Sequence, residues 1–270
     1  TMKACHFSAK AMLPLFLLLW GYGSVLRAEA VYAHIELVAG VVSIFDVKGQ
    51  SRIPRVNDII EVGETVVTGR NGELQARTDD HGFIAFRPNT KMKIESYLAH
   101  GGKEDSVVIS LLYGTLRSIT GWIGKSNPEN YAIRTPSATI GIRGTDHEPN
   151  VILPPGAGET QSAAPGTYEK VNAGTTVVKN ASGQTVVNAN QAAFAPHDPK
   201  AAPKVLERIP EIYKPTANEA RIEERSKELG KEVEAKRLEK QKELKELKEA
   251  KEDAHKKNSK EKKHHPASEK

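Results

Sequence analysis

The residues best suited to chemistry lie in one run, residues 131–145, which reads YAIRTPSATIGIRGT. Arg134 and Arg143 each carry a planar guanidinium that can bind a carboxylate or phosphate through parallel hydrogen bonds. Gly144 permits a bend beside Arg143, and Thr145 adds a hydroxyl. These four residues are our candidates for a ligand- or partner-binding site. An alternative is that they satisfy backbone carbonyls or a nearby carboxylate at a strand corner.

The triplet Asp146-His147-Glu148 contains metal-binding residue types. Adjacent residues of an extended strand point to opposite faces, so the three side chains cannot converge on one ion. Nothing in the sequence brings His81 or His100 close to them, and His264-His265 lies in a lysine-rich tail. We therefore expect no metal site and no cofactor.

Motifs of enzymes are missing from the sequence as well. No serine stands in a Gly-x-Ser-x-Gly elbow, and there is no glycine-rich phosphate loop. Carbohydrate processing would need paired carboxylates on one strand face, and none stand at a convincing spacing. We expect a protein that is not an enzyme.

The elements that would position these residues are β-strands. From His34 to Thr145, short alternating segments are separated by glycine-marked turns, and the pattern returns between Tyr168 and Ala195. Residues 149–166 are rich in proline, glycine and small side chains and are expected to form an exposed loop. The sequence predicts an all-β domain over residues 31–196, built as a small solenoid or a sandwich-like fold.

The first thirty residues resemble a signal peptide. Lys3 and Lys10 precede the apolar block Met12 to Tyr22, and Ala28-Glu29-Ala30 has small residues at the spacing of a cleavage site. Cys5, the single cysteine, lies inside this leader, so a mature protein would have no thiol. We expect export to the periplasm or medium, with a cleaved leader or a retained anchor as the alternatives.

After the β domain the composition changes twice. Four prolines mark residues 197–215 as a linker. Thr216 and Glu219 then form a capping-box pattern, and a long charged helix is expected over residues 216–256, followed by a disordered lysine-rich tail at 257–270. The apolar stripe of the helix is too irregular for a sustained coiled coil, so self-association, docking on a partner and a spacer role all stay open.

Several ordered motifs of the β region resemble the FecR domain, which is named after a sensor that relays signals across the cell envelope. The resemblance covers about His34 to Pro196 and rests on Gly40-Val41-Val42, residues 62–69, Asp80-His81-Gly82 with residues 83–86, Pro88-Asn89-Thr90, residues 112–117, and residues 135–145.

The resemblance implies an all-β module of the envelope that binds something or scaffolds an assembly. Sensor members carry an anti-sigma segment and a membrane-spanning helix before this domain, whereas only the expected leader precedes Val31. We therefore expect an exported, non-enzymatic binding or signalling module. The alternative is a scaffold that anchors or oligomerises through its helix. The net charge of +5 suits an envelope protein or anionic polymer as partner and does not argue for nucleic acid.

Overall fold

The computed structural model of the protein describes residues 30–156 and 163–263. The expected leader up to residue 29 and the end of the tail from residue 264 lie outside this part of the chain. Fifteen strands, two short helical turns and one long helix follow one another in this order: β1 (Val31–Ala39), β2 (Val42–Phe45), β3 (Ser51–Arg52), β4 (Ile59–Glu61), β5 (Thr65–Thr68), β6 (Glu73–Thr78), β7 (Phe83–Phe86), β8 (Lys91–Leu98), β9 (Ser106–Ile119), α1 (Trp122–Ser126), η1 (Pro128–Asn130), β10 (Tyr131–Arg134), β11 (Thr139–Ile152), β12 (Gly166–Asn180), β13 (Gly183–Asn188), β14 (Gln191–Pro196), β15 (Lys204–Val205) and α2 (Glu219–Lys263).

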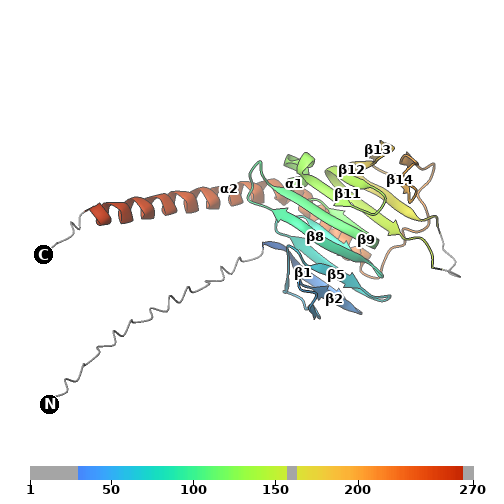
Figure 1. The fold of residues 1–270 in the computed structure, drawn as a ribbon, viewed down its shortest axis with the longest axis horizontal. Coiled ribbons are helices and arrows are strands. Elements are labelled where there is room, and N and C mark those ends of the chain that lie inside the picture. Colours follow the sequence, from blue (N-terminus) through green and yellow to red (C-terminus); the bar gives the residue numbers. More distant parts are fainter. Residues whose placement is uncertain (1–29, 157–162, 264–270) are drawn as a thin grey trace, which may run out of the picture.

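The strands form one connected mixed sheet that consists of two rows. Row A runs in the order β4, β1, β6, β7, β9, β11, β12, β14, β15. Row B runs in the order β3, β2, β5, β8, β9, β10, β11, β12, β13. The long strands β9, β11 and β12 belong to both rows, each contributing one half to row A and the other half to row B (Figure 1).

Glycines lie where these three strands pass from one row to the other. Gly114, Gly144 and Gly174 all have positive φ, at 89°, 57° and 80°. A side chain on Gly174 would place its Cβ 2.3 Å from the carbonyl oxygen of Gly144. Glycine is required here both for the left-handed backbone conformation and for the close approach of the two strands.

The two rows enclose one apolar core. Alternate residues of each strand point inward, so Leu74 and Phe86 of row A join Val66 and Ile109 of row B in a single buried cluster. Because both rows contribute to this cluster, each row has one inner face and one outer face.

The outer face of row A is covered by helix α2. Its first half crosses the strands of row A, and the rest of the helix extends well beyond the sheet (Figure 1). Ile222 and Leu229 pack with Phe83, Ala85 and Ile119, which point outward from β7 and β9. Among the described residues, no helix or strand packs on the outer face of row B in the way that α2 packs on row A.

Helix α2 is long but strongly charged. Among the helices that the structure describes, none combines the length and the apolar character required to cross a bilayer.

The expected all-β fold with a helical region at the C-terminal end is confirmed at that level. A solenoid stacks its strands in parallel, whereas among the described pairs only β9 with β10 is parallel. The pairing is therefore that of an open mixed sheet. It does not establish a sandwich either, because all the strands belong to one connected sheet.

The prediction of an exposed loop over residues 149–166 was wrong at its start. Residues up to Ile152 continue β11, and Val151 is buried. Asn150 pairs with Thr115 of β9 on one side and with Tyr168 of β12 on the other. Pairing on both edges overrides the loop-like local composition.

Two further boundaries were also wrong. The predicted linker contains β15, which pairs with β14 through Phe194 and Lys204, because the segment passes the open edge of row A. Helix α2 continues to Lys263, into the segment predicted to be disordered, since residues 257–263 keep the composition of good helix formers.

The bends give a first testable prediction. Gly174→Ala should lower the free energy of unfolding by roughly 1–3 kcal/mol through backbone strain alone, measured by urea denaturation. The matched control is Gly141→Ala, because a Cβ at Gly141 would meet nothing within 4 Å and its φ is not positive. Equal stability of the two variants would contradict the role of Gly174 in the bend.

Candidate functional site

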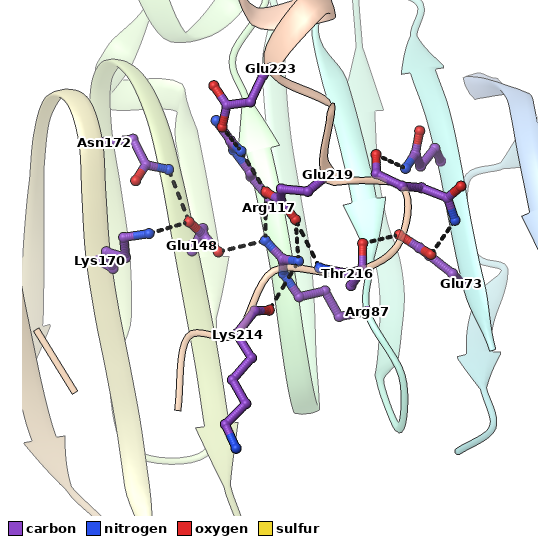
Figure 2. Close-up of polar contacts among 12 residues, drawn as sticks. Glu73, Arg87, Arg117, Glu148, Lys170, Asn172, Lys214, Thr216, Glu219 and Glu223 are labelled. Atoms are coloured by element: carbon purple, nitrogen blue, oxygen red, sulfur yellow. Dashed lines mark hydrogen bonds and ion pairs between the residues drawn. The ribbon is translucent and has the colours of Figure 1, made fainter. Parts of the chain in front are cut away.

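The most highly organised polar site of the protein lies between row A and helix α2. Arg87, which follows β7, and Arg117 of β9 point outward from the sheet towards the start of the helix (Figure 2). Both side chains are more than nine-tenths buried, at 8% and 4% exposure. A buried guanidinium cannot lose its proton, so each arginine requires compensating carboxylates.

The sheet supplies one carboxylate to each arginine. Asp146 accepts two hydrogen bonds from Arg117, from Nε at 3.0 Å and from Nη2 at 2.8 Å. Glu148 accepts one from Nη2 of Arg87 at 2.8 Å and another from Nζ of Lys170 at 2.8 Å. Asp146 and Glu148 are two residues apart on β11 and therefore share its outer face.

The helix supplies the carboxylate that joins the two arginines. Glu219 accepts hydrogen bonds from Nη1 of Arg87 at 2.7 Å and from Nη1 of Arg117 at 2.7 Å, each with a different carboxylate oxygen. One turn further on, Glu223 accepts a bond of 2.6 Å from the same nitrogen of Arg117. Glu219 thus bridges both guanidinium groups and ties the helix to two strands (Figure 2).

The local structure at the helix start places Glu219 in this position. The backbone N–H of Thr216 donates to a Glu219 oxygen at 3.3 Å, which is one half of the expected capping box. The other half is absent, because the Thr216 hydroxyl donates to Glu73 of β6 at 2.6 Å instead. Asn218 also donates to Glu73, at 2.5 Å. The cap of the helix is therefore built partly from the sheet.

Further contacts hold the helix along its length. Glu36 of β1 accepts from Arg225 at 2.9 Å and from Arg221 at 3.2 Å. Near the other end of the docked portion, the Gln241 amide donates to the carbonyl of Gly101. Together with the apolar contacts of Ile222 and Leu229, these bonds anchor residues 219–241 to row A and to the turn after β8.

The charges of the site shift the pKa of Glu219, of Asp146 and Glu148, and of the two arginines. Burial alone raises the pKa of Glu219, but the hydrogen bonds and charge of Arg87, with those from Thr216 and Arg117, lower it to about 2. Burial likewise opposes ionisation of Asp146 and Glu148, and their arginine and lysine partners nevertheless lower the pKa of both carboxyls. The pKa values of Arg87 and Arg117 are raised by the same carboxylates, against the effect of their own burial. All five groups are charged at neutral pH.

The triplet Asp146-His147-Glu148 divides between the two faces of β11, as its alternation requires. Asp146 and Glu148 face the helix, whereas His147 faces the core and shares a hydrogen bond of 2.7 Å with Glu169. His147 and Glu169 are completely buried. Within the described residues, no group of three or more histidine, cysteine, aspartate or glutamate side chains is arranged to hold a metal ion.

The four candidate residues from the sequence lie outside this site. Arg134 and Arg143 are exposed on the outer face of row B, on the opposite side of the sheet from the helix. Gly144 forms the bend of β11. Thr145 is buried, and its backbone N–H donates to the Thr120 hydroxyl at 2.9 Å. The structure brings the two arginines onto one face, apart from the helix and its ion pairs.

Sequence reasoning missed the residues of the helix-docking site: Arg87, Arg117, Asp146, Glu148, Glu219 and Glu223. Charged residues inside otherwise apolar strands could have indicated this site. Arg117 lies two residues before Ile119, so the two share an outward face that a covering element must bury.

Removing the bridging charge tests the site directly. Glu219→Gln keeps the shape of the side chain but leaves two buried arginines with less compensation, so the free energy of unfolding should fall by roughly 1.5–3 kcal/mol. Hydrogen exchange of the backbone amides between Ile222 and Val233 should accelerate at the same time. The control is Glu249→Gln, whose exposed partner Lys245 lies 3.9 Å away, with an expected change below about 0.5 kcal/mol. Unaltered exchange in Glu219→Gln would show that the bridge does not hold the helix.

The site also predicts a pH dependence. Because the pKa of Glu219 is lowered from 4.5 to about 2 by docking, its contribution to stability is fully present above pH 4.5. This contribution is lost as the pH falls from 4.5 towards 2. Urea denaturation at a series of pH values should show a decline in this window that is smaller in Glu219→Gln. Parallel curves for the two proteins would contradict the assignment.

Comparisons with known proteins find a family match over part of the chain. Residues 64–164 match the family described as FecR protein. Two crystal structures of a putative anti-sigma factor from Parabacteroides distasonis ATCC 8503 are similar at 10% and 11% identity, with TM-scores of 0.40 and 0.41. Each alignment covers 53% of this chain and 59% of the other, so the chain spans less than two thirds of those proteins.

A cell surface anchoring domain is similar at 26% identity over 23% of this chain and 82% of that domain, with a TM-score of 0.22. No curated protein matches the chain. The motifs noted in the sequence and the family match agree, and residues 64–164 of the chain are similar to the FecR protein family.

Proposed function

We propose that this protein is an exported, non-enzymatic FecR-domain protein that acts as a binding or signalling module in the cell envelope. The FecR family is of a regulatory, signalling type. The leader-like block Met12 to Tyr22, with its preceding lysines, supports export.

The observation that carries the proposal is the bridge from Glu219 to Arg87 and Arg117. It fastens a helix that extends far beyond the sheet to the body of the FecR domain (Figure 1). A partner that pulls on or binds the extended part acts on the first turn of the same helix, and through it on the buried charges of row A.

The polar side chains between row A and the helix are already paired with one another, which supports a binding module rather than an enzyme. Asp146, Glu148 and Arg117 are of residue types that can serve in catalysis, and each is engaged in the ion pairs beneath the helix. A catalytic group must instead be free to contact a substrate.

Export is tested with a reporter enzyme that gains activity only outside the cytoplasm, fused after Lys270 of the full chain. We expect an active reporter in the native protein and in the control Leu17→Val/Leu18→Val, which keeps the block apolar. Leu17→Arg/Leu18→Arg interrupts the apolar block and should abolish activity. An active reporter in the arginine variant, or an inactive one in the native protein, would contradict export.

Chemical crosslinking in intact cells tests the binding role. It should give a species larger than the protein itself, and an exported protein that stays uncrosslinked would contradict the binding role.

The alternative function is a scaffold that oligomerises through α2. Leu238 and Leu247 on the helix are 49% and 57% exposed, which favours this reading over a fully solvated spacer. Light scattering of the full chain over a range of concentrations separates the two functions. A particle mass that rises with concentration and returns to the monomer in Leu247→Glu supports the scaffold, whereas a constant monomer mass excludes it.

A further inference from the structure

The outer face of row B carries an ordered line of side chains across eight strands. Residues that pair directly across neighbouring strands point to the same side of a sheet. Starting from β2, one such line runs through Phe45, Thr65, Lys93, Ser110, Arg134, Thr139, Lys179 and Gln184. We call it the cationic line.

The three cations of this line are evenly placed. Lys93, Arg134 and Lys179 are each separated by two strand steps, which puts them about 10 Å apart at a spacing of roughly 4.8 Å between strands. Arg134 and Lys179 are exposed. Arg143 faces the same side two residues beyond Gly141 on β11, and it adds a fourth cation beside the line.

Few negative charges oppose these cations. Glu95 of β8 pairs with Lys93 at 2.9 Å; the hydrogen bond from Lys93 chiefly lowers the pKa of its carboxyl, and the charge of Arg134 lowers it further. Asp46, near one end of the line, is engaged by the backbone N–H groups of Lys48 and Gln50. Arg134 and Lys179 remain as the cations best placed to meet an anion from outside.

A hollow of about 400 Å³ lies at the β2 end of the line. It is lined by Phe45, Thr65 and Lys93 of the line itself, with Asp46, Lys91 and Gly63 among the residues beside them. Its volume falls in the range of small-ligand sites, and an aromatic ring with nearby cations suits an acidic sugar unit. The hollow and the line therefore form one continuous surface.

We propose that this face binds an extended acidic polysaccharide, with one end in the hollow and successive anionic groups along the cationic line. The inference rests on the proposed function, because an exported protein meets anionic polymers of the envelope. Ser110 and Thr139 lie between the cations and Thr65 lies beside Lys93, and the hydroxyls of these three residues can bond to the hydroxyls of sugars. The positive charges of the line favour a negatively charged ligand, and the straight, regular spacing of the line favours an extended one.

Other anionic partners fit this face less well. Single-stranded nucleic acid requires successive aromatic platforms for its bases, and Phe45 stands at one end of the line only. An acidic helix requires an apolar groove for its anchors. The line presents hydroxyl and cationic side chains at alternate positions instead.

Binding of alginate oligomers, a polyuronate, to the purified full chain tests the proposal by calorimetry at several salt concentrations. Arg134→Gln/Lys179→Gln should weaken binding at least tenfold and reduce the slope of log affinity against log salt by about 1.4, or about 0.7 per lost contact. The control Lys242→Gln/Lys245→Gln removes the same charge from α2 and should change affinity less than twofold. Affinity should also rise with oligomer length up to about 34 Å, the seven strand steps of the line.

Four outcomes would overturn the proposal. The first two are absence of alginate binding at low salt and equal alginate binding by the native protein and the Arg134→Gln/Lys179→Gln variant. The third is binding of neutral dextran as tight as that of alginate. The fourth is tighter binding of a single-stranded oligonucleotide than of alginate, weakened by the same variant. Thermal unfolding of the variant serves as the folding control. Because this assay uses purified protein, it is independent of the export reporter, so either proposal can fail without the other.

Discussion

The structure depends on the neutralisation of two buried arginines. Arg87 and Arg117 each receive one carboxylate from β11, and each keeps an Nη1 group that the sheet does not satisfy. The single carboxylate of Glu219 accepts a hydrogen bond from each of these two Nη1 groups. A buried charge without its partner costs several kcal/mol, so the sheet without its helix would be left with an unfavourable surface. The helix is therefore part of the domain's own electrostatic balance.

This balance explains how a poorly amphipathic helix holds its place. Few apolar side chains anchor it, chiefly Ile222, Leu229 and Val233, and they are spaced seven and four residues apart. A helix of this composition would gain little from apolar burial alone. The ion pairs of Glu219 and Glu223 fix its start, and the apolar anchors then set the direction in which it crosses row A.

The sequence predicted the kinds of element better than their assembly. Alternation of apolar residues identified most strands, and the helix was recognised from its capping pattern at Thr216 and Glu219. The apolar stripe of the helix left self-association, docking on a partner and a spacer role open, whereas Ile222 and Leu229 pack with Phe83 and Ile119 of the same chain. The capping glutamate was likewise assigned a local role. Glu219 also contacts Arg87 and Arg117, which lie more than a hundred residues earlier in the chain. A local sequence pattern cannot predict contacts between residues so far apart.

The bend at Gly144 shows why the candidate residues of the sequence and the helix-docking site lie apart. In an unbroken strand, Arg143 and Asp146 would lie three positions apart on opposite faces of one layer. The left-handed backbone at Gly144 moves the chain from row B to row A between them. Arg143 therefore faces outward from row B, and Asp146 faces outward from row A. One short motif serves both outer faces of the protein: one is occupied by its own helix, and the other is open to a partner of opposite charge.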